Sequence, residues 1–189
     1  LDKYDVEEQN LIKIDLLCNR GLSQLWELSD IPVADYDPYD KLASELLCRG
    51  EVLGLTQSES RTMRKCILAL QPKSVYDVAL ALALIRPAAA DGGRKAAFLR
   101  KENKRQIITD EDAIEYISDS IDCTMDKADY YRRGFSKQMP NVISEFMSRL
   151  DNHRGSTERG DILKELKHSP KYSYCRGHAL AYGQLVWAL

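Results

Sequence analysis

Charged residues near the end of the chain form the first group that could carry chemistry. Arg176 and His178 flank Gly177, just before an apolar run that predicts a helix over residues 177–189. The amino terminus of a helix attracts anions through its free N–H groups and its dipole. Arg176 at such a terminus would make a phosphate site. His178 could donate to the same phosphate or only satisfy the nearby backbone.

A second group consists of Asp129, Arg132 and Arg133. Adjacent residues on a helix point about 100° apart. One arginine can therefore face a phosphate while the other holds Asp129, which lies three or four positions back. The planar guanidinium fork suits this role because it pairs with two phosphate oxygens at once. The alternative is a pair of ordinary surface arginines.

Asp15 and Arg86 are single charged residues next to apolar segments. Asp15 interrupts the apolar run at residues 11–17, where a carboxylate is costly to bury unless a cation or hydrogen bonds meet it. As part of a strand it would share a face with Lys13, either as a structural ion pair or as a magnesium ligand. A single carboxylate is too few for a two-metal site. Arg86, before Pro87, must extend to solvent or find a partner.

Composition sets limits on the class of protein. The chain has 189 residues and a net charge of −2, which argues against a free-standing nucleic-acid-binding protein. Basic residues nevertheless gather at 94–105 and 127–137, either to line one wall of a polyanion channel or as solvated helix faces. No apolar run reaches the roughly 20 residues of a membrane span, so we expect no membrane contact.

The five cysteines are scattered and form no CxxC pair, which favours a reducing cytosol and a cytoplasmic protein. The first residue is Leu, and the final apolar segment lacks a helix stop signal. We therefore expect both ends to be cut from a longer polypeptide.

The periodicity predicts a mainly α fold, with one or two short strands near the start. Buried or short strands are expected at residues 11–17 and 52–55, and a polar loop at 151–160. Asp37 is expected to cap a helix whose first position is Pro38 and which Gly50 closes. Capping pairs at Ser74 and Thr109 precede two further helices. The expected helices cover residues 21–28, 38–49, 58–70, 75–85, 109–121, 125–134, 140–150, 161–167 and 177–189.

Ordered motifs over nearly the whole chain resemble the family C bacterial-type replicative DNA polymerases. Residues 11–22 are similar to the family pattern VKxDLLGxRxL, and residues 54–64 to GxFQxESxxMR. Residues 85–87 resemble the YRPG turn, and the segment 109–137 resembles one that ends ADxxRRxxxKK. Residues 174–183 resemble FxKSHAxAY. Each motif is short, but the five occur in the family's order.

The resemblance implies a fragment of the alpha subunit of DNA polymerase III, or of an error-prone or phage relative. Residues 1–30 would end the palm, and residues 31–189 would form helical fingers. Asp15 would be a catalytic carboxylate and a magnesium ligand, in a two-metal site completed by carboxylates outside this chain. The incoming dNTP triphosphate would contact Arg132, Arg133, Arg176, His178 and Arg86. The partners implied are primer–template DNA, dNTPs and other replisome subunits.

The chain departs from the family pattern in several places. The upstream DxD carboxylates are absent, so the fragment alone should not polymerise DNA. Family residues are missing after the turn at 85–87, where Ala88 replaces a glycine, and Cys175, Arg176 and Gly177 replace the usual Asn, Lys and Ser. Two alternatives therefore stand beside the polymerase: a non-catalytic nucleic-acid-binding or scaffold module of the same descent, and an unrelated helical interaction domain.

Overall fold

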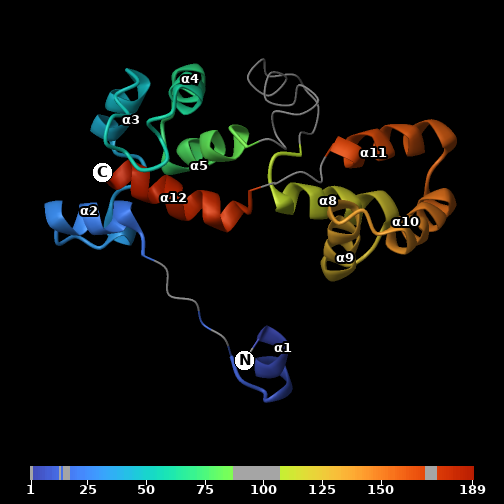
Figure 1. Cartoon of the computed structure of the whole chain (residues 1–189). Helices are drawn as coiled ribbons and strands as arrows, with labels where there is room; N and C mark the ends of the chain where they lie inside the picture. Colours follow the sequence, from blue (N-terminus) through green and yellow to red (C-terminus); the bar gives the residue numbers. More distant parts are fainter. Residues whose placement is uncertain (1, 13, 15–17, 87–106, 169–173) are drawn as a thin grey trace.

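The computed structural model describes residues 2–12, 14, 18–86, 107–168 and 174–189. Over these residues the chain is mainly α-helical, which confirms the predicted fold class. The helices form two groups, and the short helix α1 (Lys3–Glu8) lies apart from both (Figure 1). The first group contains α2 (Arg20–Leu28), η1 (Val33–Asp35), α3 (Lys41–Cys48), α4 (Arg61–Leu70), α5 (Val75–Leu84) and α12 (Arg176–Ala188). The second contains α8 (Asp110–Ile121), α9 (Met125–Ser136), α10 (Pro140–His153) and α11 (Ser156–His168).

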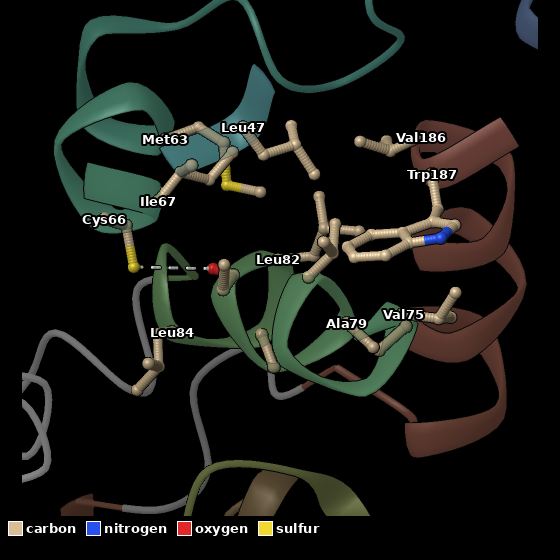
Figure 2. Close-up of a cluster of buried hydrophobic side chains, with 14 of the residues drawn as sticks. Leu47, Met63, Cys66, Ile67, Val75, Ala79, Leu82, Leu84, Val186 and Trp187 are labelled. Carbon is tan, nitrogen blue, oxygen red and sulfur yellow. Dashed lines mark hydrogen bonds between the residues drawn. The ribbon is translucent and has the colours of Figure 1, made fainter. Parts of the chain in front are cut away.

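Helix α5 is the centre of the first group because nearly all of its surface is apolar and buried. Figure 2 shows its Leu82 between α4, which contributes Met63 and Ile67, and α12, which contributes Trp187. Helix α12 approaches α5 closely at Gly183, where a Cβ atom would lie 3.0 Å from the backbone nitrogen of Ala79. The absence of a side chain at Gly183 therefore lets the two helices pack together.

The second group has its own core, built on aromatic side chains. Tyr131 and Phe135 of α9 both meet Phe146 of α10 edge-on, with ring centroids 5.4 and 5.2 Å apart. Such edge-to-face contacts are the preferred geometry of aromatic pairs. A close approach at Gly134 and Val142 brings α9 and α10 together. The second group is thus a separate buried cluster, and its first helix, α8, begins beside the first group (Figure 1).

Local capping explains where several helices begin. Ser74 caps α5, and Thr109 caps α8 in a reciprocal capping box with Asp112, both as predicted. Ser60 caps α4, so this helix begins later than the predicted position 58. Each cap satisfies a backbone N–H group that would otherwise lack a partner at the helix start.

The start of α3 was predicted wrongly. Asp40, not Asp37, accepts from the backbone of the first turn, and Pro38 lies before the helix. Tertiary hydrogen bonds explain the shift, because the Asp37 carbonyl accepts from Trp187 Nε1 at 2.9 Å and the Pro38 carbonyl accepts from the Val75 N–H. These bonds hold residues 37–38 outside the helix. Gly50, with φ of +75°, ends α3 as predicted.

The short strands predicted near the start are not formed by the described residues. Leu11, Ile12 and Ile14 are exposed and belong to no strand, and Lys13 and Asp15 lie outside the described residues. Residues 52–55 form a turn in which the Leu55 N–H bonds the Val52 carbonyl and Gly54 takes a φ of +84°. A strand needs a neighbouring strand as its hydrogen-bond partner. Here the Leu55 N–H and the Val52 carbonyl bond to each other within the turn instead.

The loop predicted at 151–160 is also mostly helical. Helix α10 continues to His153, and α11 already begins at Ser156. The guanidinium group of Arg154 donates to the carbonyls of Asp119 (2.6 Å) and Ser120 (3.0 Å) at the end of α8. This tertiary contact fixes a tight turn where the sequence suggested only a polar segment.

Candidate functional site

The first turn of α8 is the structural centre of the candidate site. Asp112 Oδ2 accepts from the backbone N–H groups of Ile108 (3.0 Å) and Thr109 (2.8 Å), while the Thr109 hydroxyl accepts from the Asp112 N–H. Three acidic residues fall in this turn: Asp110, Glu111 and Asp112. Their negative charges interact favourably with the positive end of the helix dipole. Their carboxylate oxygens also accept hydrogen bonds from arginines of other helices.

Arg176, at the first position of α12, binds this acidic turn. Its Nη2 atom donates to Asp112 Oδ1 at 2.8 Å and to Glu115 Oε1 at 3.3 Å, and its backbone N–H donates to Glu111 Oε2 at 2.7 Å. Burial by itself would lower the pKa of Arg176, but these carboxylates outweigh it and raise that pKa. The side chain predicted to bind a phosphate is therefore held by carboxylates in this structure.

Arg132 and Arg133 of α9 share Asp129 as a partner. Asp129 Oδ1 accepts from Arg132 Nε at 2.8 Å, and Oδ2 accepts from Arg133 Nε at 2.7 Å. Arg132 also donates through Nη1 to Asp110 Oδ1 at 3.3 Å, which ties α9 to the first turn of α8. The spacing rule predicted one arginine on Asp129, whereas the structure places both there.

The protonation of Asp129 reflects this double contact. Burial alone would raise the pKa of its carboxyl group, but the hydrogen bonds from Arg132 and Arg133 outweigh burial and lower that pKa. Hydrogen bonds that favour the charged form have this effect. The two arginines thus favour the ionised form of Asp129.

Arg86 packs on Tyr174, just before α12. Its guanidinium carbon lies 4.3 Å from the ring centroid of Tyr174, a cation–π distance. Gln57 Oε1 accepts from both Arg86 Nη2 and the Tyr174 hydroxyl, each at 3.2 Å. Arg86 Nε is buried and has no hydrogen-bond partner among the described residues. Among the described residues, Arg86 is thus oriented by the Tyr174 ring and by Gln57, and not by a carboxylate.

His178 lies between two aromatic rings on the exposed side of α12. Its ring centroid is 4.9 Å from that of Tyr174 and 4.7 Å from that of Tyr182. Its backbone N–H donates to Cys175 Sγ, which caps the helix. The sequence left open whether the His178 side chain contacts a phosphate or the nearby backbone. In the structure the helix cap uses the backbone N–H of His178, and the imidazole remains exposed.

Tyr174 connects these groups. It pairs with Thr109, the cap of α8, in a parallel bridge, and its carbonyl accepts from the Asp110 N–H at 3.4 Å. Through this bridge and the acidic turn, the structure connects the cations that the sequence singled out: Arg86, Arg132, Arg133, Arg176 and His178. Asp15, predicted as catalytic and as a magnesium ligand, lies outside the described residues.

Sequence reasoning missed the residues that hold these cations. Asp110, Glu111 and Glu115 were treated only as part of a helix, and Gln57 and Tyr174 only as motif letters. A cluster of acids directly after a capping threonine was the available signal. No group of three or more His, Cys, Asp or Glu side chains that could hold a metal ion occurs in the described part of the chain.

Two cavities of the structure lie away from these cations. An open cavity of about 580 Å³ has walls from α3, α4 and the end of α12, including Leu46, Arg64 and Trp187. A smaller one, of about 320 Å³, lies between α8 and α11 beside Arg154. Neither of these two hollows is lined by Arg86, Arg132, Arg133, Arg176 or His178.

Comparison with known proteins identifies the class of this helical domain. It is the fingers domain of a polymerase. The family model described as "Bacterial DNA polymerase III alpha subunit finger domain" matches residues 19–168. The chain belongs to this family, which confirms the resemblance read from its motifs.

Curated relatives agree with this assignment. DNA polymerase III subunit alpha of Thermotoga maritima is 24% identical over 98% of this chain and 23% of its own length. The error-prone DNA polymerase of Bdellovibrio bacteriovorus is 27% identical over 99% of this chain and 21% of its own length. That of Bradyrhizobium diazoefficiens is 32% identical over 56% of this chain and 10% of its own length. The chain thus spans about a quarter or less of these relatives.

The alignment with the Bdellovibrio enzyme runs over 225 residues, more than the 189 of this chain. The relative therefore carries residues that this chain lacks. In the part of the chain that the structure describes, no helix is both long enough and apolar enough to cross a bilayer.

Proposed function

We propose that the chain is the fingers part of a DNA-directed DNA polymerase, a nucleotidyltransferase, and that it binds the triphosphate of an incoming dNTP beside primer–template DNA. In this proposal residues 1–30 end the palm and residues 31–189 form the fingers. The isolated chain binds but does not polymerise. Other replisome subunits are its partners, and its place is the cytoplasm. The residues on the nucleotide side are Arg132, Arg133, Arg176, His178 and Arg86.

The single observation that supports the proposal is that Arg132 of α9 and Arg176 of α12 both contact the first turn of α8. Arg132 reaches Asp110, Arg176 reaches Asp112, and the Tyr174–Thr109 bridge brings the other side of the site to the same turn. Arg133 joins them through Asp129, and Arg86 and His178 both pack on Tyr174. The arginines have the donor fork that pairs with phosphate oxygens, and a bound triphosphate would take the place of some of their carboxylate contacts.

In the proposed reaction, a primer 3′-hydroxyl attacks the α-phosphate and pyrophosphate leaves. The arginines of this chain would hold the leaving phosphates in line and neutralise the charge that develops on them. His178, with its accessible imidazole, would donate to a phosphate oxygen. Magnesium, held by Asp15 and carboxylates outside this chain, would supply further neutralisation of the triphosphate.

A binding measurement on the chain itself distinguishes the proposed polymerase function from the alternative of a non-catalytic scaffold module. Inorganic tripolyphosphate and a dNTP are titrated calorimetrically into the wild-type chain, the double variant Arg133→Ala/Arg176→Ala and the control Arg49→Ala. Arg49 is a matched control because its exposed side chain contacts Glu45 of α3, a helix of the first group, whereas α8 belongs to the second (Figure 1). Losing two charge-assisted contacts should weaken binding at least about tenfold in the double variant, and Arg49→Ala should bind as the wild type does.

Two results would overturn the proposal. One is a wild-type chain that binds neither tripolyphosphate nor dNTP. The other is an equal loss of affinity in the double variant and in Arg49→Ala, which would indicate only general charge attraction. In a longer polypeptide that carries the upstream carboxylates, Asp15→Asn should abolish primer extension while the protein stays folded.

A further inference from the structure

Three large apolar side chains are exposed close together at the end of α2. Trp26 is 67% exposed, Leu28 is 70% exposed, and Ile31, three positions beyond the helix, is 50% exposed. The inner face of α2 is buried, with Leu25 only 1% exposed. Single apolar side chains are normal on a protein surface, whereas neighbouring large ones mark interaction sites. We call Trp26, Leu28 and Ile31 the Trp26 patch.

Acidic residues alternate with the apolar residues of this patch. Glu27 follows Trp26 and Asp30 precedes Ile31, and both acids are exposed. Residues 21–40 contain five acidic residues and no Lys, Arg or His, although the net charge of the whole chain is only −2. Among the described residues, neither Glu27 nor Asp30 has an ion-pair partner. These two carboxylates are therefore available to a cationic partner.

Hydrogen bonds hold the segment that carries the patch. Gln184 Nε2 of α12 donates to the carbonyls of Val33 (3.0 Å) and Tyr36 (3.3 Å). Within the turn that follows α2, the Ile31 N–H donates to Ser29 Oγ at 3.2 Å. These bonds order the backbone before a partner arrives, so that docking would lose less conformational entropy.

Exposed apolar groups beside available carboxylates indicate the chemistry of a partner. DNA and anionic lipid surfaces are negatively charged, and Coulomb repulsion disfavours their approach to this face. A protein segment that presents Lys or Arg next to large apolar side chains would complement both features. Tryptophan is among the residues that contribute most to protein–protein binding, which suits Trp26 as the central anchor.

We propose that the Trp26 patch is a docking surface for a cationic amphipathic segment of another protein. Trp26, Leu28 and Ile31 would contact the apolar side of that segment, and Glu27 and Asp30 would pair with its Lys or Arg side chains. The inference goes beyond the proposed function, because α2 lies at the far side of the first helix group from α8 and its cations (Figure 1). A failed docking test would therefore leave the nucleotide proposal unaffected.

The test uses two peptides of about 18 residues, each with apolar and charged positions at helical spacing. One combines Leu with Lys, and the other combines Leu with Glu. The chain has two tryptophans, and Trp187 is 5% exposed, so a change in tryptophan emission reports mainly on Trp26. The Lys peptide should bind, shift this emission to shorter wavelength and reduce its quenching by acrylamide. The Glu peptide should do neither, because its charge repels Glu27 and Asp30.

Trp26→Ala measures the apolar contribution. Affinity for the Lys peptide, followed by calorimetry because the reporter is gone, should fall about tenfold, as expected for an interface anchor. The melting temperature should change little, since the side chain is exposed. Leu53→Ala is the matched control, because Leu53 is 91% exposed but lies in the turn at residues 52–55.

Glu27→Gln/Asp30→Asn measures the charge contribution. Losing two exposed ion pairs should weaken binding of the Lys peptide roughly three- to tenfold. Glu158→Gln/Asp161→Asn makes the same change of charge at exposed positions of α11, in the second helix group, and should leave the affinity unchanged.

Equal binding of the Lys and Glu peptides would overturn the proposal, because the acidic residues would then select nothing. A wild-type chain that binds neither peptide would also overturn it, as would equal losses of affinity in Trp26→Ala and Leu53→Ala. A shift of tryptophan emission with rising chain concentration, in the absence of peptide, would identify a second copy of the chain as the occupant instead.

Discussion

The guanidinium group of Arg176 donates a 2.8 Å hydrogen bond to Oδ1 of Asp112 and thereby joins α12 of the first helix group to α8 of the second. The other carboxylate oxygen of Asp112 accepts from two backbone N–H groups at the start of α8. One side chain therefore caps a helix and links the two cores.

Asp112→Ala should cost more stability than Arg176→Ala. The first variant loses the two hydrogen bonds by which the Asp112 side chain completes the capping box, worth about 1 kcal/mol, together with the ion pair. The second loses only a partly exposed ion pair, worth at most about 1 kcal/mol. Urea unfolding of both single variants and of the double variant measures the two contributions and their coupling. Equal costs for the two single variants would contradict the capping role.

Gly134→Ala should destabilise the second core. A Cβ atom at Gly134 would overlap Val142 Cγ1 of α10, and forcing extra atoms into a packed contact typically costs about 1–3 kcal/mol. Gly160 of α11 is the matched control, because nothing lies within 4 Å of its Cβ position. There, Ala should stabilise the chain by up to about 1 kcal/mol through helix propensity. Thermal unfolding should thus give opposite signs, and equal shifts would refute the close contact.

The ion pairs of Asp129 should make stability fall in acid. The pKa of its carboxyl group is lowered in the folded chain from the ordinary value of 3.8. The stabilisation is therefore fully present above pH 3.8 and is lost as pH falls through the lower, folded pKa. The free-energy difference between wild type and Asp129→Asn should shrink as pH falls through this window.

Urea unfolding at a series of acid pH values checks this prediction, with the Arg132→Ala/Arg133→Ala background as its control. In that background Asp129 has lost both arginine partners, so Asp129→Asn should show no such dependence on pH. A dependence that persists there would trace the effect to another group.

Trp187→Phe should weaken the first core. The indole N–H of Trp187 donates to the Asp37 carbonyl at 2.9 Å, and the side chain is 5% exposed. Phenylalanine cannot donate this bond and is smaller, so we expect a loss of about 1–2 kcal/mol in the free energy of unfolding. Trp26, which is 67% exposed, is the matched control, and Trp26→Phe should change stability little. Similar losses in the two variants would argue against the buried bond.

The sequence alone determined most features that depend on neighbours three or four positions apart. The capping box of Thr109 and Asp112, the cap of α5 at Ser74 and the contact of Asp129 with one of its two arginines all join residues within about one helical turn. The same local logic placed α5, α8, α9 and α10 close to their observed bounds. The family followed from the order of short motifs, and the match to residues 19–168 confirms it.

Only the tertiary structure decided which partners the remote cations take. Arg176 meets Asp112, 64 positions away, and Arg132 meets Asp110, 22 positions away, because the helices carrying them pack beside α8. Hydrogen bonds from Val75 and Trp187 to the carbonyls of residues 38 and 37 likewise explain why the cap of α3 is Asp40 and not the predicted Asp37. Local periodicity cannot encode such contacts, since they depend on the path of the chain between the two residues. The same physical reason separates Arg132 from Arg133: Arg132 contacts Asp110 of α8, whereas Arg133, one position later, contacts only Asp129 of its own helix and is 66% exposed.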